Sequence, residues 1–330
     1  LEDTGFIGDP FTWRRGDIME RLDRVVCNLE EMKGITNSFF KQLYSCDASV
    51  DPSHIISLVK PRVTGEMNYD LCKPFTEKEI SGALFQMGPL KAPGPDGFTT
   101  EFLRASWDII KQDICDAFNK FHTANGRGFQ KLNEALLTLL PKRADAHSLF
   151  DYRPISLIHI FAKLVAKLLS LRLAPRLNTM VSTNQSAFIA GRCIHDNYLL
   201  VQQTARLLHN LKAPHMLLKL DIARAFDNIS WPFLLQLLQH LGLGPCWREW
   251  ISMLLSTAST KVLINDHPGP PIDHAHGLRQ GDPVSPMLFT LVIDVLNSML
   301  LHAVELGLLH RLTNRHTALS ISLYADDVVI

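Results

Sequence analysis

Three aspartates stand where they could do metal-assisted chemistry. Asp221 follows the near-continuous apolar run 217–220, which only Lys219 interrupts, and the pair Asp326–Asp327 has apolar residues on both sides. If these segments are strands of one sheet, the three carboxylates converge, and clustered carboxylate oxygens attract hard cations such as Mg²⁺. Two such ions stabilise the attacking and leaving oxygens of a phosphoryl displacement. This chemistry requires Asp221 to lie within roughly 10 Å of the Asp326–Asp327 tip, because Mg²⁺ binds its ligands at about 2.0–2.1 Å.

An Asp-Asp pair is weak support for a metal site when taken alone. Acidic composition produces such a pair about once in a chain of this size, and most of these pairs lie in solvated turns. Here the pair follows Tyr324 and Ala325 inside an apolar segment. Burying unpaired acids there would be costly. We therefore expect Asp326 and Asp327 to be buried and metal-bound.

The elements that must position these acids are short strands. We expect a strand over residues 217–222 and a hairpin over 321–330 with the acids at its tip. Because the chain stops at residue 330, we expect this pair on an unpaired sheet edge. A capping box at Thr76 and Glu79 predicts a helix to residue 87. Further expected elements are helices over 29–44, 100–122, 161–177, 230–242, 245–258 and 285–306, a strand within 132–140, and a hairpin with a long turn over 265–270.

Composition and charge exclude several classes of protein. The 330 residues are 46% hydrophobic and 20% charged, which excludes a disordered or fibrous chain. Thirty-three basic residues balance thirty-three acidic ones, so any polyanion site must be local. Residues 131–176 form such a patch, with eight basic and three acidic residues. The apolar run 283–293 ends at Asp294, short of the ~20 residues of a membrane span, so we expect no membrane partner.

Three histidines near a Pro/Gly-rich turn raise a metal hypothesis of their own. His267, His274 and His276 lie close together in the sequence, but no cysteine stands beside them to complete a zinc-type ligand set. We expect them to be polar loop residues.

Several ordered motifs together resemble one enzyme family. Residues 324–327 (Tyr-Ala-Asp-Asp) and 220–227 (Leu-Asp-Ile-Ala-Arg-Ala-Phe-Asp) resemble motifs C and A of a reverse transcriptase, and residues 277–289 resemble motif B. The finger motifs of non-LTR (LINE-type) retrotransposons are similar to residues 91–97, 151–157, 184–188 and 191–192. The residues of these motifs are similar to those of plant LINE elements in particular. The resemblance covers about residues 73–330.

The resemblance implies a two-metal site. Asp221 and Asp326 would bridge two Mg²⁺ ions, or Mn²⁺ in their place, between the primer 3′-hydroxyl and the incoming triphosphate. Asp327 would support the site and is assigned with them as a catalytic and metal residue. Asp227 would hold finger or palm groups in place. Asp294 would cap or pair locally and take no part in catalysis.

The resemblance also implies which residues bind the substrates. Lys142 and Arg153 would grip the triphosphate from the fingers, because cations stabilise the charge on the phosphates. Phe226 would act as a steric gate that excludes a 2′-hydroxyl. Gln280 and Gly281 would contact the nucleotide and the template.

The implied fold is α+β, with an antiparallel polymerase palm sheet backed by helices, and fingers inserted before it. We expect an acidic N-terminal remnant over residues 1–72, similar in residues 11–13 and 21–24 to the tail of an endonuclease domain plus a linker. Fingers would span 73–197 and an incomplete palm 198–330, with the thumb absent and the chain truncated after the Tyr-Ala-Asp-Asp motif. The partners would be an RNA template, a DNA primer and dNTPs, in the nucleus. The oligomeric state is left open.

Two rival hypotheses remain at this point. The chain could be a catalytically inactive retroelement remnant that at most binds nucleic acid through the patch at residues 131–176. It could also be an RNA-dependent RNA polymerase or an intron maturase that shares the palm. Ala325 and Phe226 favour deoxynucleotides over ribonucleotides.

Overall fold

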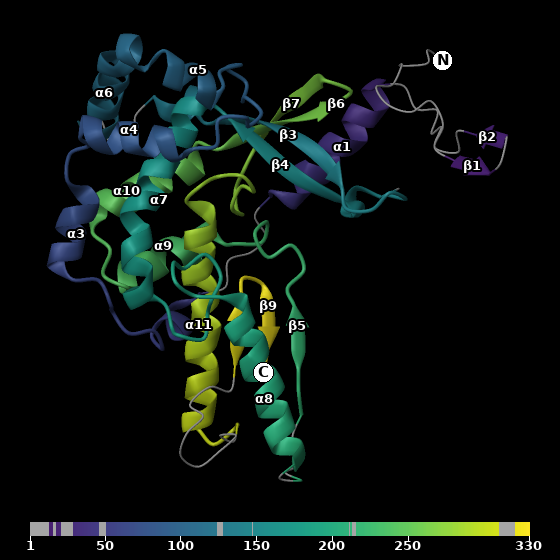
Figure 1. Ribbon diagram of the computed structural model, residues 1–330, viewed down its shortest axis with the longest axis vertical. Helices are drawn as coiled ribbons and strands as arrows, with labels where there is room; N and C mark the ends of the chain where they lie inside the picture. The colour runs from purple at the N-terminus through teal and green to yellow at the C-terminus, as the bar shows by residue number, and fades with distance from the viewer. Residues whose placement is uncertain are drawn as a thin grey trace.

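The main strands form two sheets, with helices packed around them (Figure 1). The computed structural model describes residues 13–15, 18–20, 29–45, 51–123, 128–146, 148–210, 212, 216–309 and 321–330. The described part is α+β, with an antiparallel sheet backed by helices, as predicted. Strands β1 (Trp13–Arg15) and β2 (Ile18–Glu20) form a hairpin of their own. Residues 11–12 and 21–24, which resemble an endonuclease tail, lie outside the described residues.

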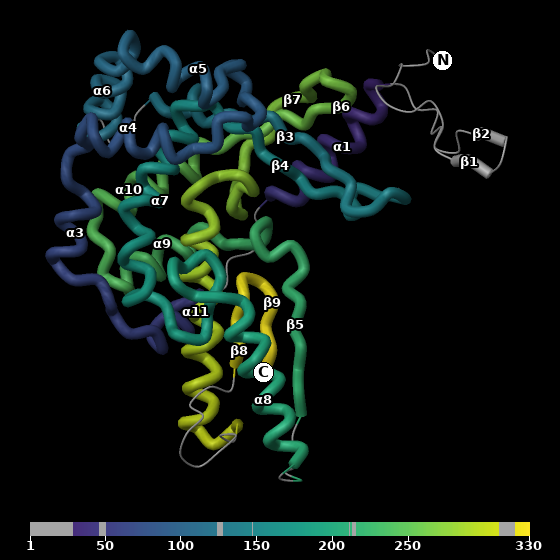
Figure 2. Tube along the Cα trace, in the orientation of Figure 1, coloured from purple at the N-terminus to yellow at the C-terminus, as the bar shows by residue number. Residues whose placement is uncertain are grey.

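Four strands form the larger sheet, in the order β4–β3–β6–β7. They are β3 (Glu134–Pro141), β4 (Tyr152–Ile158), β6 (Ser259–Ile264) and β7 (His267–Asp273). Strands β3 and β6 are parallel, and the two outer pairs are antiparallel. Helix α1 (Leu29–Leu43) lies along this sheet (Figure 2) and shares a buried cluster with it that includes Phe40, Leu137 and Val262. The sheet therefore takes its strands from both sides of the expected finger–palm boundary.

Three short antiparallel strands form the smaller sheet, in the order β5–β9–β8. They are β5 (Lys219–Asp221), β8 (Ser322–Tyr324) and β9 (Asp327–Val329). Alternation along the strands turns Leu220, Leu323 and Val328 towards Leu296 and Leu300 of helix α11. The sheet lies beside α11 and α8 in Figure 1. The expectation of an unpaired edge is wrong, because β9 pairs on one side with β8 and on the other with β5.

Helices form the rest of the described chain around one large core. The α-helices are α2 (Ser53–Ile56), α3 (Gly65–Cys72), α4 (Glu77–Gln86), α5 (Thr100–Ala105), α6 (Trp107–Thr123), α7 (Ile160–Met180), α8 (Ile194–Asn210), α9 (Trp231–His240), α10 (Pro245–Ser256) and α11 (Ser285–Glu305), with short 3-10 turns at Phe129–Leu132 and Leu149–Asp151. Trp247, Trp250 and Phe118 are fully buried in this core. In the described ranges only α11 is long and apolar enough to cross a membrane. Its packing against α7 and the smaller sheet accounts for that apolar character.

Two expected elements have a different form in the structure. The capping box at Thr76 and Glu79 begins α4 as predicted. The expected helix over 100–122 is instead two helices, α5 and α6, separated at Ser106. Arg104 donates hydrogen bonds to the carbonyls of Phe85 and Met87, which anchors α5 to the end of α4 before α6 begins.

The hairpin of β6 and β7 has a tight turn, so the expectation of a long one is wrong. Asn265 and Asp266 alone connect the strands, with φ +48° and +62°. Two positive φ values are typical of a type I′ turn, which matches the twist of antiparallel strands. Pro268, Pro270 and Pro271 were expected in the turn or beside it but lie within β7. A strand tolerates prolines when it is at the edge of its sheet, as β7 is.

Candidate active site

The aspartates predicted to act together lie at one end of the smaller sheet. Asp221, the last residue of β5, is the cross-strand partner of Asp327, the first residue of β9. Such partners have Cα atoms about 4.5–5.5 Å apart, and their side chains share a face. Asp326 directly precedes Asp327, in the two-residue turn after β8. The predicted convergence is therefore confirmed for Asp221 and Asp327.

Asp221 and Asp327 are exposed and Asp326 is half-buried, so the expectation that Asp326 and Asp327 are buried is wrong. The side chain of Asp327 is 58% exposed, and Lys219 Nζ lies 3.5 Å from its carboxylate. Alternation explains this, because Leu220 and Val328 occupy the inner face of the same strands. Repulsion between the carboxylates, rather than their burial, is what favours a bound cation, since like charges directly opposite one another destabilise a sheet.

The donor set fits a magnesium ion that shares its coordination with a substrate. Within the described ranges, no group of three His, Cys, Asp or Glu side chains could hold a metal by itself. Mg²⁺ is commonly bound through one or two carboxylates, with waters and substrate phosphates completing its shell. Asp221 and Asp327 supply such carboxylates on an exposed face, where phosphates can reach them.

A glycine turn fixes the segment after β5 to the segment before α11. The amide of Leu278 donates to the carbonyl of Phe226 at 2.8 Å. The indole Nε1 of Trp231 donates to the carbonyl of Gly277 at 2.7 Å. Gly277 has φ +82°, and a Cβ there would lie 2.6 Å from the carbonyl oxygen of Asp227. Only glycine fits this contact, which brings the residues resembling motif B against those resembling motif A.

The ring of Phe226 is half-buried and stacks on Phe289 of α11, with ring centroids 4.3 Å apart and planes at 12°. The stack holds the ring rigidly beside the segment that follows Asp221. Its role as a steric gate stays a prediction.

Gln280 and Gly281 lie against strand β4. The amide of Ser156 donates to the carbonyl of Gln280 at 3.0 Å. Gly281 has φ +108°, and a Cβ there would lie 3.0 Å from the carbonyl oxygen of Ser156. This contact brings the predicted nucleotide-binding pair to the strand that carries Arg153.

A buried glutamine that the sequence analysis gave no role holds the tip of the β8–β9 hairpin. Gln185 Oε1 accepts hydrogen bonds from the amides of Ala325, at 3.1 Å, and Ala187, at 2.8 Å. The neighbouring backbone continues the sheet, because the amide of Ser186 donates to the carbonyl of Leu323. Gln185 is fully buried. The motif at residues 184–188 was the available signal, but its partner 140 residues away could not be inferred.

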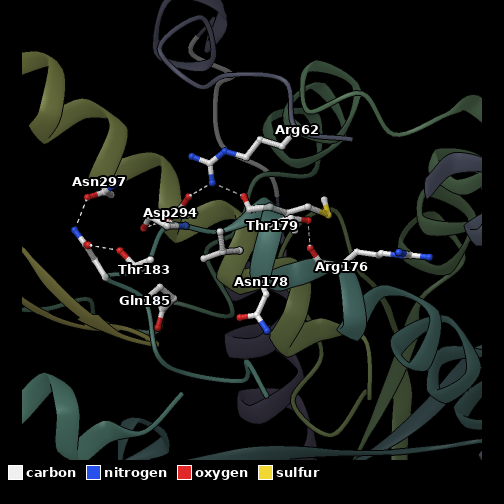
Figure 3. Close-up of polar contacts among 12 residues, drawn as sticks. Arg62, Arg176, Asn178, Thr179, Thr183, Gln185, Asp294 and Asn297 are labelled. Atoms are coloured by element: carbon white, nitrogen blue, oxygen red, sulfur yellow. Dashed lines mark hydrogen bonds and ion pairs between the residues drawn. The ribbon is translucent and has the colours of Figure 1, made fainter. Parts of the chain in front are cut away.

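Asp294 makes structural contacts, but the expectation that it caps or pairs locally is wrong, because its partners are distant in the sequence. Its carboxylate accepts from the Ser182 amide at 3.0 Å and lies 3.4 Å from Arg62 Nη1. Figure 3 shows Arg62 and Asp294 pointing towards each other, with Asn297 further along α11. Burial raises the pKa of Asp294, while Ser182 and Arg62 lower it. These contacts attach α11 to the loop that contains Gln185.

The predicted triphosphate-binding residues lie on the β3–β4 hairpin. Arg153 and Lys142 are exposed, and Lys142 Nζ donates to the carbonyl of Phe150 at 2.9 Å. Lys142 and Arg224 both lower the pKa of Asp227, which burial raises to about 6, so both cations lie near this carboxyl group. In the described ranges no hydrogen bond or ion pair joins Lys142 or Arg153 to Asp221, Asp326 or Asp327.

The basic patch at residues 131–176 is partly neutralised by ion pairs. Arg172 lies 3.1 Å from Glu79, and Arg176 pairs with Asp70. Arg143 pairs with Asp151 at 2.9 Å. These three arginines hold parts of the fold together, so fewer cations face solvent than the sequence count suggests.

His274 is not the polar loop residue expected from the sequence. It is buried, its ring stacks on Tyr44 with centroids 3.9 Å apart, and its Nε2 lies 2.6 Å from Thr260 Oγ1. Burial, reinforced by the charge of Arg279, lowers the pKa of His274 to about 3. His274 is therefore a neutral part of the contact between α1 and the larger sheet.

Comparisons with known proteins agree with the family that the sequence motifs resemble. The family described as "Reverse transcriptase (RNA-dependent DNA polymerase)" matches residues 140–330. The "Transposon TX1 uncharacterized 149 kDa protein" of Xenopus laevis is 31% identical over 308 residues, which cover 91% of this chain and 23% of that protein. A "Retrovirus-related Pol polyprotein from type-1 retrotransposable element R2" of Popillia japonica is 27% identical over 231 residues, 68% of this chain and 30% of that protein.

A solved structure titled "Partial Cas6-RT-Cas1--Cas2 complex" has a TM-score of 0.40 and 18% identity, over 78% of this chain and 37% of that chain. This similarity is too low to support an argument. The chain spans about a quarter of the length of the curated relatives it matches.

Proposed function

Because the chain belongs to the reverse transcriptase (RNA-dependent DNA polymerase) family, we propose that it adds deoxynucleotides to a DNA 3′-end on an RNA template. It is a reverse transcriptase domain of the non-LTR retrotransposon type, by its similarity to R2 and TX1 proteins. The observation that carries the proposal is the register of the smaller sheet, which makes Asp221 and Asp327 direct partners on an exposed face.

In the proposed mechanism the protein positions groups around these carboxylates. Asp221, Asp326 and Asp327 would hold two Mg²⁺ ions, or Mn²⁺, and divalent ions bound there would supply charge that stabilises phosphoryl transfer. Gln185 fixes the hairpin tip through Ala325, and so limits movement of the neighbouring acids.

The substrates are held by the residues around that centre. We propose that Lys142 and Arg153 orient the triphosphate, that Phe226 excludes ribonucleotides, and that Gln280 and Gly281 contact nucleotide and template. The proposed partners are an RNA template, a DNA primer and dNTPs. An origin in a plant LINE element, action in the nucleus and the boundaries at residues 72 and 197 also belong to the proposal. These parts of the proposal rest on the resemblance of the sequence motifs alone.

The proposal is tested by primer extension with the 330-residue chain, an oligo(dT)-primed poly(rA) template and Mg²⁺. We expect dTTP incorporation, and a loss of about 100-fold or more in Asp221→Asn and Asp327→Asn, which is typical when charge stabilisation of a transition state is removed. Asp273→Asn is the matched control, because Asp273 is an exposed carboxylate on β7.

Three outcomes would contradict the proposal. Undiminished incorporation in both variants would refute the metal assignment. Incorporation of UTP in preference to dTTP would favour an RNA polymerase. No incorporation by the wild-type chain, together with a gel shift on the same duplex, would favour an inactive remnant that binds nucleic acid.

A further inference from the structure

Arg224 packs against two aromatic rings that come from distant parts of the chain. Its guanidinium carbon is 4.1 Å from the ring centroid of Phe150 and 5.2 Å from that of Phe39. The two rings also contact each other edge to face, at 5.3 Å. Phe39 belongs to α1, and Phe150 to the connection between β3 and β4. Arg224 follows Asp221 by three residues, so the cluster joins three separate segments beside the carboxylates.

The same cluster holds the residue proposed to grip the triphosphate. Lys142 Nζ donates to the carbonyl of Phe150, the residue whose ring stacks on Arg224. The amide of Lys142 donates to the carbonyl of Asp151 at 2.8 Å. A movement of Phe150 would therefore move Lys142.

The guanidinium of Arg224 contacts the two rings, and one of its nitrogens makes no hydrogen bond to the described residues. Its Nη2 is buried and has no hydrogen-bond partner among the described residues. Arg224 also has φ +51°, a conformation that is unfavourable for a residue with a side chain. A buried donor without a partner and a strained backbone are both costly, and such costs are typical of functional positions.

We propose that Arg224 is a positioning residue that couples the β3–β4 hairpin to the strand carrying Asp221, and so sets where Lys142 meets the triphosphate. The inference rests on the proposed function. Phe39 extends the coupling to α1, which lies outside the residues matched by the family.

Steady-state primer extension tests the coupling in the full chain. Arg224→Leu and Phe150→Leu should each raise the KM for dTTP about fivefold to tenfold, with kcat changed less than about twofold. That increase in KM corresponds to about 1–1.4 kcal/mol, which is a usual strength for a cation stacked on an aromatic ring. The double variant should be no worse than either single one, because both remove the same contact. Arg224→Lys keeps the cation and should recover most of the loss.

Arg104→Leu is the matched control, because the guanidinium of Arg104 lies 5.5 Å from the Phe85 ring in another part of the chain. Its KM for dTTP should stay within about twofold of the wild-type value, because it has no link to Lys142. An increase in KM in Arg224→Leu without one in Phe150→Leu would overturn the proposal, because Arg224 would then act on the substrate directly.

Hydrogen–deuterium exchange separates this inference from the proposed function. Peptides that contain the Lys142 amide should exchange about fivefold faster in Arg224→Leu than in wild type or Arg104→Leu, because local opening becomes easier. Unchanged exchange would overturn the coupling. If the wild-type chain incorporates no nucleotide, the proposed function fails, and the exchange result alone decides whether Arg224 holds the hairpin.

Discussion

Asp227 is a buried carboxyl group whose surroundings set its proton affinity. Burial raises its pKa to about 6, and the nearby cations Arg224 and Lys142 oppose that shift. Because the folded pKa is above the ordinary aspartate value of 3.8, the folded chain binds this proton more tightly than the unfolded chain does. The stability that Asp227 contributes is therefore complete below about pH 4 and is lost as the pH rises through about 6.

Asp227→Asn should remove this pH dependence, because its amide does not titrate. Relative to wild type, the free energy of unfolding of the variant should increase by up to about 3 kcal/mol between pH 3.5 and 7.5, at about 1.4 kcal/mol per pKa unit. Urea unfolding at a series of pH values measures this difference. Asp273→Asn, at an exposed position, should show no comparable trend. A constant difference between Asp227→Asn and wild type would show that the carboxyl titrates as it does in the unfolded chain.

At the scale of residues, the sequence predicted identities better than contacts. The convergence of Asp221 with Asp327 followed from strand periodicity and a motif. The exposure of these acids did not, because which face of a strand is buried depends on what packs against it. The roles of Gln185 and Arg224 also depend on segments distant in the chain, which no local pattern reveals.

At the scale of elements, a side chain from the loop over residues 88–97 caps the N-terminus of helix α7. Asp96 Oδ2 accepts a hydrogen bond from the Ile160 amide at 2.7 Å, while the N-cap residue, His159, makes no capping bond with its own side chain. His159 Nδ1 lies 3.3 Å from the same carboxylate. A cap supplied 64 residues away ties the Pro- and Gly-rich loop to the start of α7.

Asp96→Ala should therefore lower the free energy of unfolding by about 1–2 kcal/mol, as expected when a helix loses its cap. Asp96→Asn keeps an oxygen acceptor and should lose less. Chemical denaturation monitored by circular dichroism measures both changes. Asp113→Ala, at an exposed position in the middle of α6, is the control for removing a charge alone. Equal stability of Asp96→Ala and Asp113→Ala would contradict the capping role.

Most helices could be predicted from their caps and periodicity, as with Thr76 and Ser230, whose side chains accept from the amides of the first turn. The errors arose where tertiary contacts decide. The break at Ser106 depends on α4, and the position of the prolines in β7 depends on which strand lies at the sheet edge.

At the scale of the whole molecule, α1 is a part of the larger sheet's core. Phe40 is 2% exposed and shares a cluster with Leu137 and Val262, on strands β3 and β6. Tyr44 stacks on His274 at the end of β7. Periodicity predicted helix α1, but residues 1–72 were expected to be a remnant outside the fold. The residues that α1 packs against are more than ninety positions away along the chain, so the sequence did not reveal this contact. The boundary at residue 72 stays a prediction.

Phe40→Ala should destabilise the fold by about 3–5 kcal/mol, the usual range for a fully buried phenylalanine. Urea unfolding followed by tryptophan fluorescence measures this, since Trp247 and Trp250 lie in the other core cluster and report whether the two clusters unfold together. Phe102→Ala removes a ring that is 49% exposed and should cost under about 1 kcal/mol. A similar small loss for Phe40→Ala would mean that α1 contributes little to the fold.

The prolines of β7 affect how copies of this protein meet in concentrated solution. An edge strand with unpaired N–H groups can form hydrogen bonds with a strand of another chain, and repeated pairing of this kind builds fibrils. Pro268, Pro270 and Pro271 contribute no N–H to the outer border of the larger sheet. Neighbouring molecules can therefore collide at this border without adding strand after strand to it.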